Sequence, residues 1–289
     1  MNTNAYDHIL VPTDLSEFDD LAIRYALLFN KHLGSKITML HAEEVSWLGA
    51  EHPVGYYFEN PNEAKEELRA RLAEFAHRVT PESARVATIF VDDAPEHAIV
   101  NKAREIHADL IMMATHGRYG LRRAIVGSVT ESVLRHTTLP VLTVTPRLFA
   151  VDDKIALRTI LCPVNFSDVA RASFKQAKAM AKAFDAELIA IHVAEDGLDD
   201  VEKRLSAWIE PRYKKIVVKG DPASTVLDAA DQIHADLIVI GAQHKLFHDT
   251  TVVGTTTERI TRFARHAVLT VVRKPVARHA EEREEALTV

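Results

Sequence analysis

An internal repeat is the feature that most constrains how this chain folds. The segment HILVPTDLS near the start has a counterpart in TILCPVNFS, so that Pro12 matches Pro163 at a spacing of 151 residues. Further along, GSVTESVLRHTTLPVLTV matches GTTTERITRFARHAVLTV, and Gly127 matches Gly254 at a spacing of 127 residues. Two copies of one arrangement therefore fill most of the 289 residues, a length typical of about two domains.

The spacing shrinks because the first copy holds additional residues between His41 and Pro95, and the natural place for them is SWLGAEHPVGYYFENPNE. The aromatic residues Tyr56, Tyr57 and Phe58 of this insert suit a lid over a ligand, a partner patch or simple closure over the core, and the sequence does not decide among these. The expected division of the chain is a first domain at 1–147, a second at 156–275 and a charged, disordered tail at 276–289.

Each copy alternates strand and helix patterns. HILVPTD, ITMLHAEEV, RVATIFVDD, DLIMMAT and LPVLTVTP are short apolar runs typical of strands, and they are separated by segments with apolar residues at helical spacing. The first of these helical segments ends at Gly34, as a helix C-terminus should. Strands alternating with helices predict a parallel sheet with helices on both faces, and ligands of such sheets bind beyond the carboxyl ends of the strands.

The loop ATHGRYGLRRAIVGSVTE predicts an anion site. It leaves a buried strand and enters a helix at Ser128, whose spacing to Glu131 is that of a capping box. Gly127 lacks a Cβ and permits close approach of a ligand, while the helix start offers unpaired N–H groups and partial positive charge. Arg118, Arg122 and Arg123 add charge to the loop. The combination favours phosphate, although glycines that serve only turn geometry and a serine that only caps would give the same pattern.

These segments resemble the universal stress protein family. The resemblance rests on a small residue followed three residues later by Gly117, on nine further residues before Gly127-Ser128, and on the matching first and last strands. It implies tandem α/β/α sandwich domains, each with a five-stranded parallel sheet of Rossmann-like type. One branch of the family binds ATP, so ATP, or ADP or AMP, is the implied ligand, with magnesium entering only through the phosphates.

The resemblance implies a site in each copy. In the first, it assigns the base and ribose to Pro12, Thr13, Asp14 and Ala42, and the phosphates to Ala114, Gly117, Arg118, Gly127, Ser128, Val129 and Thr130. Ala114 departs from the family glycine by one methyl group. In the second, the matching residues are Pro163, Asn165, Val193, Gly241, His244, Gly254, Thr255 and Thr257. Asn165 loses the aspartate charge, and His244 puts a ring in place of a glycine, so we expect a degenerate and weaker second site.

The last strand of a copy, LPVLTVTP or AVLTVVRKP, would leave an exposed edge if the copy stood alone. Single-domain members of the resembled family commonly dimerise through that edge. We therefore expect the two copies to pair their last strands in an intramolecular pseudo-dimer, and we keep a homodimer of the whole chain and an unknown protein partner as further expectations.

Composition excludes several classes of function. The net charge of −6 lacks the basic field of a nucleic-acid protein, and no apolar run approaches the length of a membrane span. The N-terminus lacks a secretory pattern, so we expect a cytoplasmic protein. Cys162 is the only cysteine and lies in an apolar run, which favours an inert buried thiol. The histidines His244 and His248 have spacing close to that of metal ligands but no acidic partner, and His41 and His192 end strands, so we predict no metal site.

No catalytic residue is predicted, because the sequence contains no Ser-His-Asp arrangement, metal cluster or Walker loop. The interpretation we favour is a nucleotide-binding stress-response regulator rather than an enzyme. The alternatives are an interaction module that binds no nucleotide, and a weak ATP hydrolase.

Overall fold

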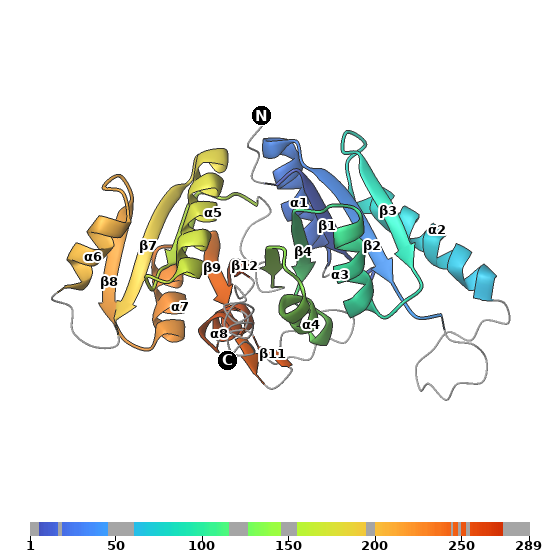
Figure 1. The fold of residues 1–289 in the computed structure, drawn as a ribbon. Coiled ribbons are helices and arrows are strands. Elements are labelled where there is room, and N and C mark those ends of the chain that lie inside the picture. Colours follow the sequence, from blue (N-terminus) through green and yellow to red (C-terminus); the bar gives the residue numbers. More distant parts are fainter. Residues whose placement is uncertain are drawn as a thin grey trace, which may run out of the picture.

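The computed structural model builds the two copies on one continuous ten-stranded sheet (Figure 1). The residues that the structure describes are 6–16, 19–45, 61–115, 127–145, 155–194, 200–243, 245–247, 250–252 and 255–273. The expected aromatic insert around Tyr56, most of the glycine loop and the charged tail lie outside these residues.

The expected strand and helix order is present in both copies. The first copy contains β1 (His8–Pro12), α1 (Asp19–Leu33), β2 (Lys36–Ala42), α2 (Pro61–Val79), β3 (Val86–Val91), α3 (Pro95–Glu105), β4 (Leu110–Ala114), α4 (Ser128–His136) and β5 (Val141–Val144). The second contains β6 (Thr159–Pro163), α5 (Asp168–Phe184), β7 (Glu187–Ala194), α6 (Val201–Trp208), β8 (Lys214–Lys219), α7 (Pro222–Gln232), β9 (Leu237–Gln243), β10 (Lys245–Phe247), β11 (Thr250–Val252), α8 (Thr255–Phe263) and β12 (Ala267–Arg273). Part of the additional length of the first copy is helical, since α2 has 19 residues and α6 has 8.

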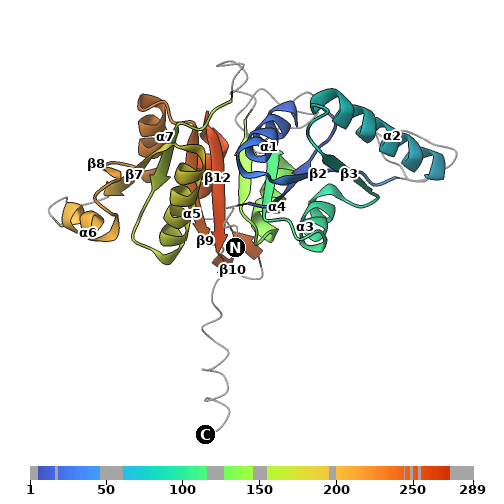
Figure 2. The same cartoon turned by 90° about the horizontal axis from the view of Figure 1, so that it is seen from above.

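The sheet order is β3-β2-β1-β4-β5-β12-β9-β6-β7-β8. Within each copy the five main strands are parallel, as predicted. Buried residues of α1, α2, α5 and α6 pack on one face, and those of α3, α4, α7 and α8 pack on the other. Figure 2 shows α2 and α6 at the two outer ends, and α1 and α5 beside the junction of the copies. None of the helices among the described residues has the length and apolar character needed to cross a bilayer.

The last strands of the two copies pair with each other, as predicted. The β5–β12 ladder is antiparallel and sets Leu142 opposite Leu269, Thr143 opposite Val268 and Val141 opposite Thr270. Leu142 and Leu269 are matching positions of the repeat, so a pseudo-two-fold axis passes between them. The Thr143 hydroxyl adds a hydrogen bond of 3.3 Å to the Val268 carbonyl across this junction.

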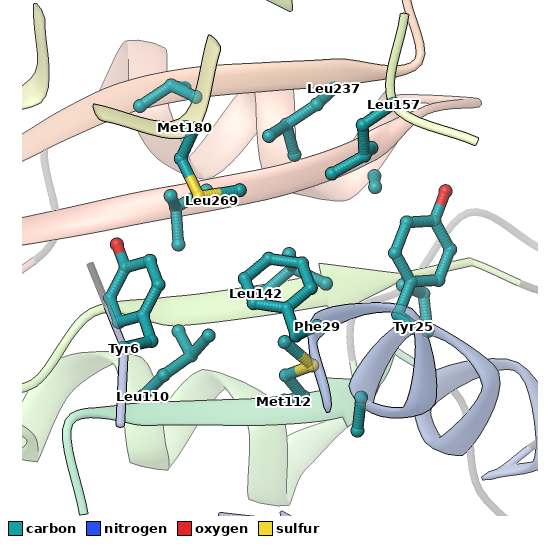
Figure 3. Packing of buried hydrophobic residues seen from close by; sticks show 14 of the residues in the cluster. Tyr6, Tyr25, Phe29, Leu110, Met112, Leu142, Leu157, Met180, Leu237 and Leu269 are labelled. Carbon is teal, nitrogen blue, oxygen red and sulfur yellow. The ribbon is translucent and has the colours of Figure 1, made fainter. Parts of the chain in front are cut away.

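The hydrophobic core continues across the junction without a break. Tyr6, Phe29 and Met112 of the first copy belong to the same buried cluster as Met180 and Leu269 of the second (Figure 3). The rings of Phe29 on α1 and Phe184 on α5 lie 5.0 Å apart. Because these side chains would meet water if the copies separated, burial of apolar surface holds the two copies together.

Candidate functional site

The carboxyl ends of β1 and β2 form one side of the predicted site. The Thr13 amide donates to the Leu40 carbonyl at 2.8 Å, and the ring Nδ1 of His41 lies 2.8 Å from the Thr13 carbonyl. His41 is 2% exposed, and its Nε2 lies 3.2 Å from Glu43. His41 therefore ties the two strand ends together, as expected for a strand-end histidine. Ala42 follows His41 as the last residue of β2, at the carboxyl ends of the strands.

Asp14 and Asp19 lie together at the end of β1. The Asp14 amide donates to Asp19 Oδ2 at 2.7 Å, the Thr13 hydroxyl donates to the same oxygen at 2.8 Å, and the Ser16 amide donates to Asp14 Oδ1 at 2.9 Å. Burial, followed by the neighbouring Asp14 carboxyl, holds the pKa of Asp19 well above its usual range. Sequence reasoning missed Asp19, because an acidic residue in the first turn of a helix is ordinary and only the fold brings it to Asp14.

The start of α4 forms the other side. The Gly127 amide donates to the Thr115 carbonyl at 2.7 Å, which anchors the helix to the end of β4. The first intrahelical bond runs from the Glu131 amide to the Gly127 carbonyl, and no side chain caps the helix. Three amides come before Glu131 in the helix, those of Ser128, Val129 and Thr130. Amides in the first turn of a helix have no carbonyl partner within the helix, so they can donate to a ligand.

The expected capping box at Ser128 is wrong. Gly127 is the N-cap residue and Ser128 is the first residue of α4, one position too late to cap it. Glu131 pairs instead with Arg135 one turn further on. Thr255 likewise begins α8 rather than preceding it. The spacing S-x-x-E does not reveal this shift, because the same letters fit a serine at either position.

Gly127 lies at a close approach within the protein. Its φ of −58° is open to any residue, but a Cβ here would lie 3.2 Å from the Thr115 carbonyl oxygen. Thr130 is buried, and its hydroxyl donates to the Ala114 carbonyl at 3.1 Å. A contact from Thr130 to a ligand would therefore come from its amide. Gly117 and Arg118, together with Arg122 and Arg123, lie outside the described residues.

The second copy repeats this framework with altered polar groups. His192 Nδ1 lies 2.7 Å from the Val164 carbonyl, and Val193 follows it as Ala42 follows His41. The Thr257 hydroxyl donates to the Gly241 carbonyl at 3.0 Å. Asn165 Oδ1 accepts from the Ser167 hydroxyl at 2.6 Å, and Ala170 stands at the position that matches Asp19. The second copy thus lacks both carboxyls of the first.

The loop before α8 also differs from the predicted glycine loop. Strands β10 and β11 pair antiparallel as a hairpin, with Leu246 opposite Thr251. The hairpin lies against α4 of the first copy through β11. His244, His248 and Gly254 lie outside the described residues. The expected effect of the His244 ring on the second site and the absence of a metal site at His244 and His248 therefore stay predictions. Among the described residues, no group of three His, Cys, Asp or Glu side chains has metal-binding geometry.

Cys162 is buried as expected. Its side chain has no exposed surface, and burial raises the pKa of the thiol to about 12. The thiolate is the reactive form of cysteine, so this residue has the character of a core side chain.

Gly241 supports a prediction about the second copy. A Cβ at Gly241 would lie 2.8 Å from the Val169 carbonyl oxygen of α5. We expect Gly241→Ala to lower the free energy of unfolding by about 1–3 kcal/mol, since the added methyl forces α5 away from β9. Urea unfolding measures this change.

The matched variant is Ala114→Gly at the equivalent position of the first copy, where a methyl group is already accommodated. It should cost only about 0.5–1 kcal/mol through added backbone freedom. A Gly241→Ala protein as stable as the wild type would contradict the tight contact between β9 and α5.

Comparisons with known proteins agree with the fold. The model of the Universal stress protein family matches residues 5–145, 156–210 and 197–272. Universal stress protein MJ0531 of Methanocaldococcus jannaschii is 29% identical over 141 residues, which cover 49% of this chain and 83% of that protein. A universal stress protein of Mycolicibacterium smegmatis is 24% identical over 294 residues, covering 91% of this chain and 96% of the relative.

Solved structures show the same tandem arrangement. The crystal structure of a universal stress protein from Archaeoglobus fulgidus superposes with a TM-score of 0.71 at 24% identity, and covers 92% of this chain and 98% of that one. A putative universal stress protein from Pseudomonas aeruginosa gives a TM-score of 0.67 at 20% identity, over 99% of both chains. At this identity the likeness concerns the fold.

Proposed function

Since the chain belongs to the universal stress protein family, we propose that its first repeat binds ATP and that the protein is a nucleotide-responsive regulator. The observation that carries the proposal is the meeting of three polar elements at one edge of the sheet. These are Asp14 after β1, the backbone of Ala42 at the end of β2, and the uncapped start of α4 after β4.

The topology supports a ligand at this edge. Strand β1 lies between β2 and β4. Strands β2 and β3 are added on one side of β1, and β4 and β5 on the other, so the order of the strands switches between β1 and β4. At such a switch point the helices on either side of the sheet leave a crevice at the carboxyl ends of the strands. A nucleotide could there place its ribose hydroxyls on Asp14 and its phosphates on the amides of Ser128 to Thr130.

Differences in the second repeat suggest that the two repeats have different roles. The second repeat carries Asn165 and Ala170 where the first repeat has two carboxyls, and strands β10 and β11 pair antiparallel in the segment before α8. Neither change removes the helix start at Thr255. We propose that the second repeat mainly completes the core and the sheet, and that its site binds nucleotide weakly or not at all.

The competing function is an interaction module that binds no nucleotide. It is supported by the continuous hydrophobic core between the copies, because a fold held together by this core needs no ligand. Mass spectrometry separates the two functions. Protein purified under native conditions and then denatured should release ATP, ADP or AMP in a ratio near one per chain. Release of no nucleotide, together with a flat calorimetric titration with ATP, would contradict the proposal.

Turnover of bound ATP should be slow. Asp19, one of the carboxyls at this end of the sheet, is buried and its Oδ2 already accepts two hydrogen bonds, which makes it a poor general base for water. We expect phosphate release far below the ordinary enzyme range of about 1–1000 per second. A continuous phosphate-release assay that reached this range would show that the protein is an enzyme.

A further inference from the structure

The two ends of the ten-stranded sheet differ in how their edges are protected. Strand β3 forms one end and β8 forms the other (Figure 1). The pairing of β3 with β2 and of β8 with β7 makes Ala87 equivalent to Lys214, and Thr88 is then equivalent to Lys215. Lysine on an edge strand opposes pairing with another chain. Strand β8, with the sequence KKIVVK, is therefore protected, whereas β3, with the sequence VATIFV, is not.

The free edge of β3 presents backbone groups that face away from the sheet. The Val91 carbonyl accepts from the Glu43 amide at 3.2 Å, so the backbone groups of Val91 face β2. Backbone groups alternate in direction along a strand, and those of Thr88 and Phe90 consequently face outward. Ala87 and Thr88 are exposed. Among the described residues, β2 is the only strand that pairs with β3.

We propose that β3 pairs antiparallel with β3 of a second molecule of this chain, about a two-fold axis at Ile89. In an antiparallel pair, residues whose backbone groups point toward the partner strand lie opposite one another. With the axis at Ile89, Thr88 of one protomer lies opposite Phe90 of its partner, and each such pair exchanges two hydrogen bonds. The sheets of the two protomers then form one continuous sheet. This inference does not depend on nucleotide binding.

Charge complementarity selects this register. Arg85 is exposed and directly precedes β3, and Asp93 follows two residues after its end. With the axis at Ile89, Arg85 of one protomer lies opposite Asp93 of its partner on the same face of the sheet, and the symmetry gives this pair twice. An axis at Thr88 or at Phe90 also matches the outward backbone groups, but it sets no opposite charges across from each other.

The side chains of β3 are complementary to themselves in this arrangement. On the face covered by α2, Thr88 meets Phe90, and a pair of a β-branched and an aromatic side chain stabilises neighbouring strands. On the other face, Ile89 meets Ile89 of the partner protomer, and Ala87 meets Val91. Ile89 and Val91 already pack against the buried cluster beneath α3 and α4, so the pairing extends that apolar surface from one protomer to the next.

The assembly closes at two protomers. Each protomer has one open edge, because β8 at the other end of its sheet carries Lys214, Lys215 and Lys219. A two-fold pairing uses the same surface of both protomers and leaves no further edge to extend. One pair of short strands is a small interface, so we expect a dissociation constant of about 100 μM. This is weaker than the β5–β12 pairing, which joins the hydrophobic cores of the two repeats.

Lysines moved from β8 to β3 test the open edge. Ala87→Lys combined with Thr88→Lys changes two exposed positions, so the melting temperature should stay unchanged. In sedimentation equilibrium up to about 1 mM, the wild type should dimerise and this variant should stay monomeric. Ser206→Lys with Ala207→Lys is the control, because it adds the same charge to exposed positions of α6, and it should dimerise as the wild type does. A monomeric wild type, or a lysine variant of β3 that dimerises equally, would overturn the proposal.

Amide hydrogen exchange locates the pairing. The Ile89 amide faces β2, as that of Val91 does, and should exchange slowly in every variant. At about 1 mM protein, a dissociation constant of about 100 μM leaves roughly a fifth of the protomers unpaired, so exchange at Thr88 and Phe90 should be about fivefold slower than in dilute solution. Rapid exchange at these two amides in a dimeric wild type would mean that the molecules associate elsewhere. Slow exchange in the monomeric lysine variant would mean that the edge is covered within the chain. Either result would overturn the proposal.

Charge reversal tests the register. Arg85→Glu sets like charges opposite each other at two symmetric places, and should weaken dimerisation about five- to tenfold. Combining Arg85→Glu with Asp93→Lys restores opposite charges across the pair, and this double variant should dimerise about as well as the wild type. A double variant that dimerises no better than Arg85→Glu alone would overturn the pairing about Ile89.

Discussion

Expressed without the second repeat, residues 1–146 should form a dimer. In the full chain β5 pairs with β12, and matching residues Leu142 and Leu269 lie opposite each other. A second copy of the fragment can present its own β5 in place of β12, because the antiparallel ladder around this axis is nearly symmetric. The fragment would otherwise expose an unpaired edge and the apolar side chains of Tyr6 and Phe29.

Sedimentation equilibrium measures the association. We expect a dimer at micromolar concentration, and a fragment that is folded by circular dichroism in the same conditions. A well-folded monomer at high micromolar concentration would show that this edge needs no partner.

Thr143→Lys in the same fragment is the control. Thr143 lies in β5 and its hydroxyl reaches across to the Val268 carbonyl at 3.3 Å. A lysine on an edge strand opposes pairing with another chain, so the variant fragment should be mainly monomeric or aggregate. If it dimerised as well as the parent fragment, the association would run through a surface other than β5.

Most of the fold follows from the repeat and the hydrophobic pattern. A parallel strand covered on both faces reads as a continuous apolar run, as LIMMA in β4 does, and each such run formed a strand. The pairing of β5 with β12 was predictable because an unpaired apolar edge is unstable in a lone domain. Helix α1 ends as predicted before Gly34, which has a φ of +73°.

The details of the candidate site depend on geometry that the letters do not contain. Ser128 was expected to cap α4, but the helix begins one residue earlier than that role allows, with Gly127 pressed against the Thr115 carbonyl. The contact of Asp19 with Asp14 depends on the left-handed turn at Leu15, φ 64°, which folds the chain back on the end of β1. The hairpin of β10 and β11 occupies a segment expected to be a loop, because local pairing of a short polar stretch leaves a weak pattern.

The helix start at Ser128 supports the prediction with the most direct bearing on nucleotide binding. Gly127→Val is a poor test of the site, although the glycine loop suggests it. Its Cβ would lie 3.2 Å from the Thr115 carbonyl oxygen, so a loss of binding would not separate a filled phosphate site from a displaced helix. A useful variant must change the ligand site and leave the fold intact.

Ser128→Asp meets this requirement. Ser128 is exposed at the first position of α4 and makes no capping bond. An aspartate in the first turn is favourable for the helix by about 0.3–1 kcal/mol, so the melting temperature should stay unchanged or rise. A phosphate bound to the same amides would meet a like charge at close range. We expect the affinity for ATP to fall by at least tenfold, which corresponds to about 1.4 kcal/mol.

The second repeat supplies the control at its equivalent position. Thr255 is the first residue of α8, and Thr255→Asp adds the same charge to the same kind of helix start. If only the first repeat binds nucleotide, this variant should bind ATP as the wild type does, and calorimetry should find one site per chain in both proteins. Equal losses from the two substitutions would mean that both repeats bind, and the loss of the carboxyls at Asn165 and Ala170 would then have little effect on binding. An unchanged affinity in Ser128→Asp would place the phosphates away from α4 and remove the main support for the proposed site.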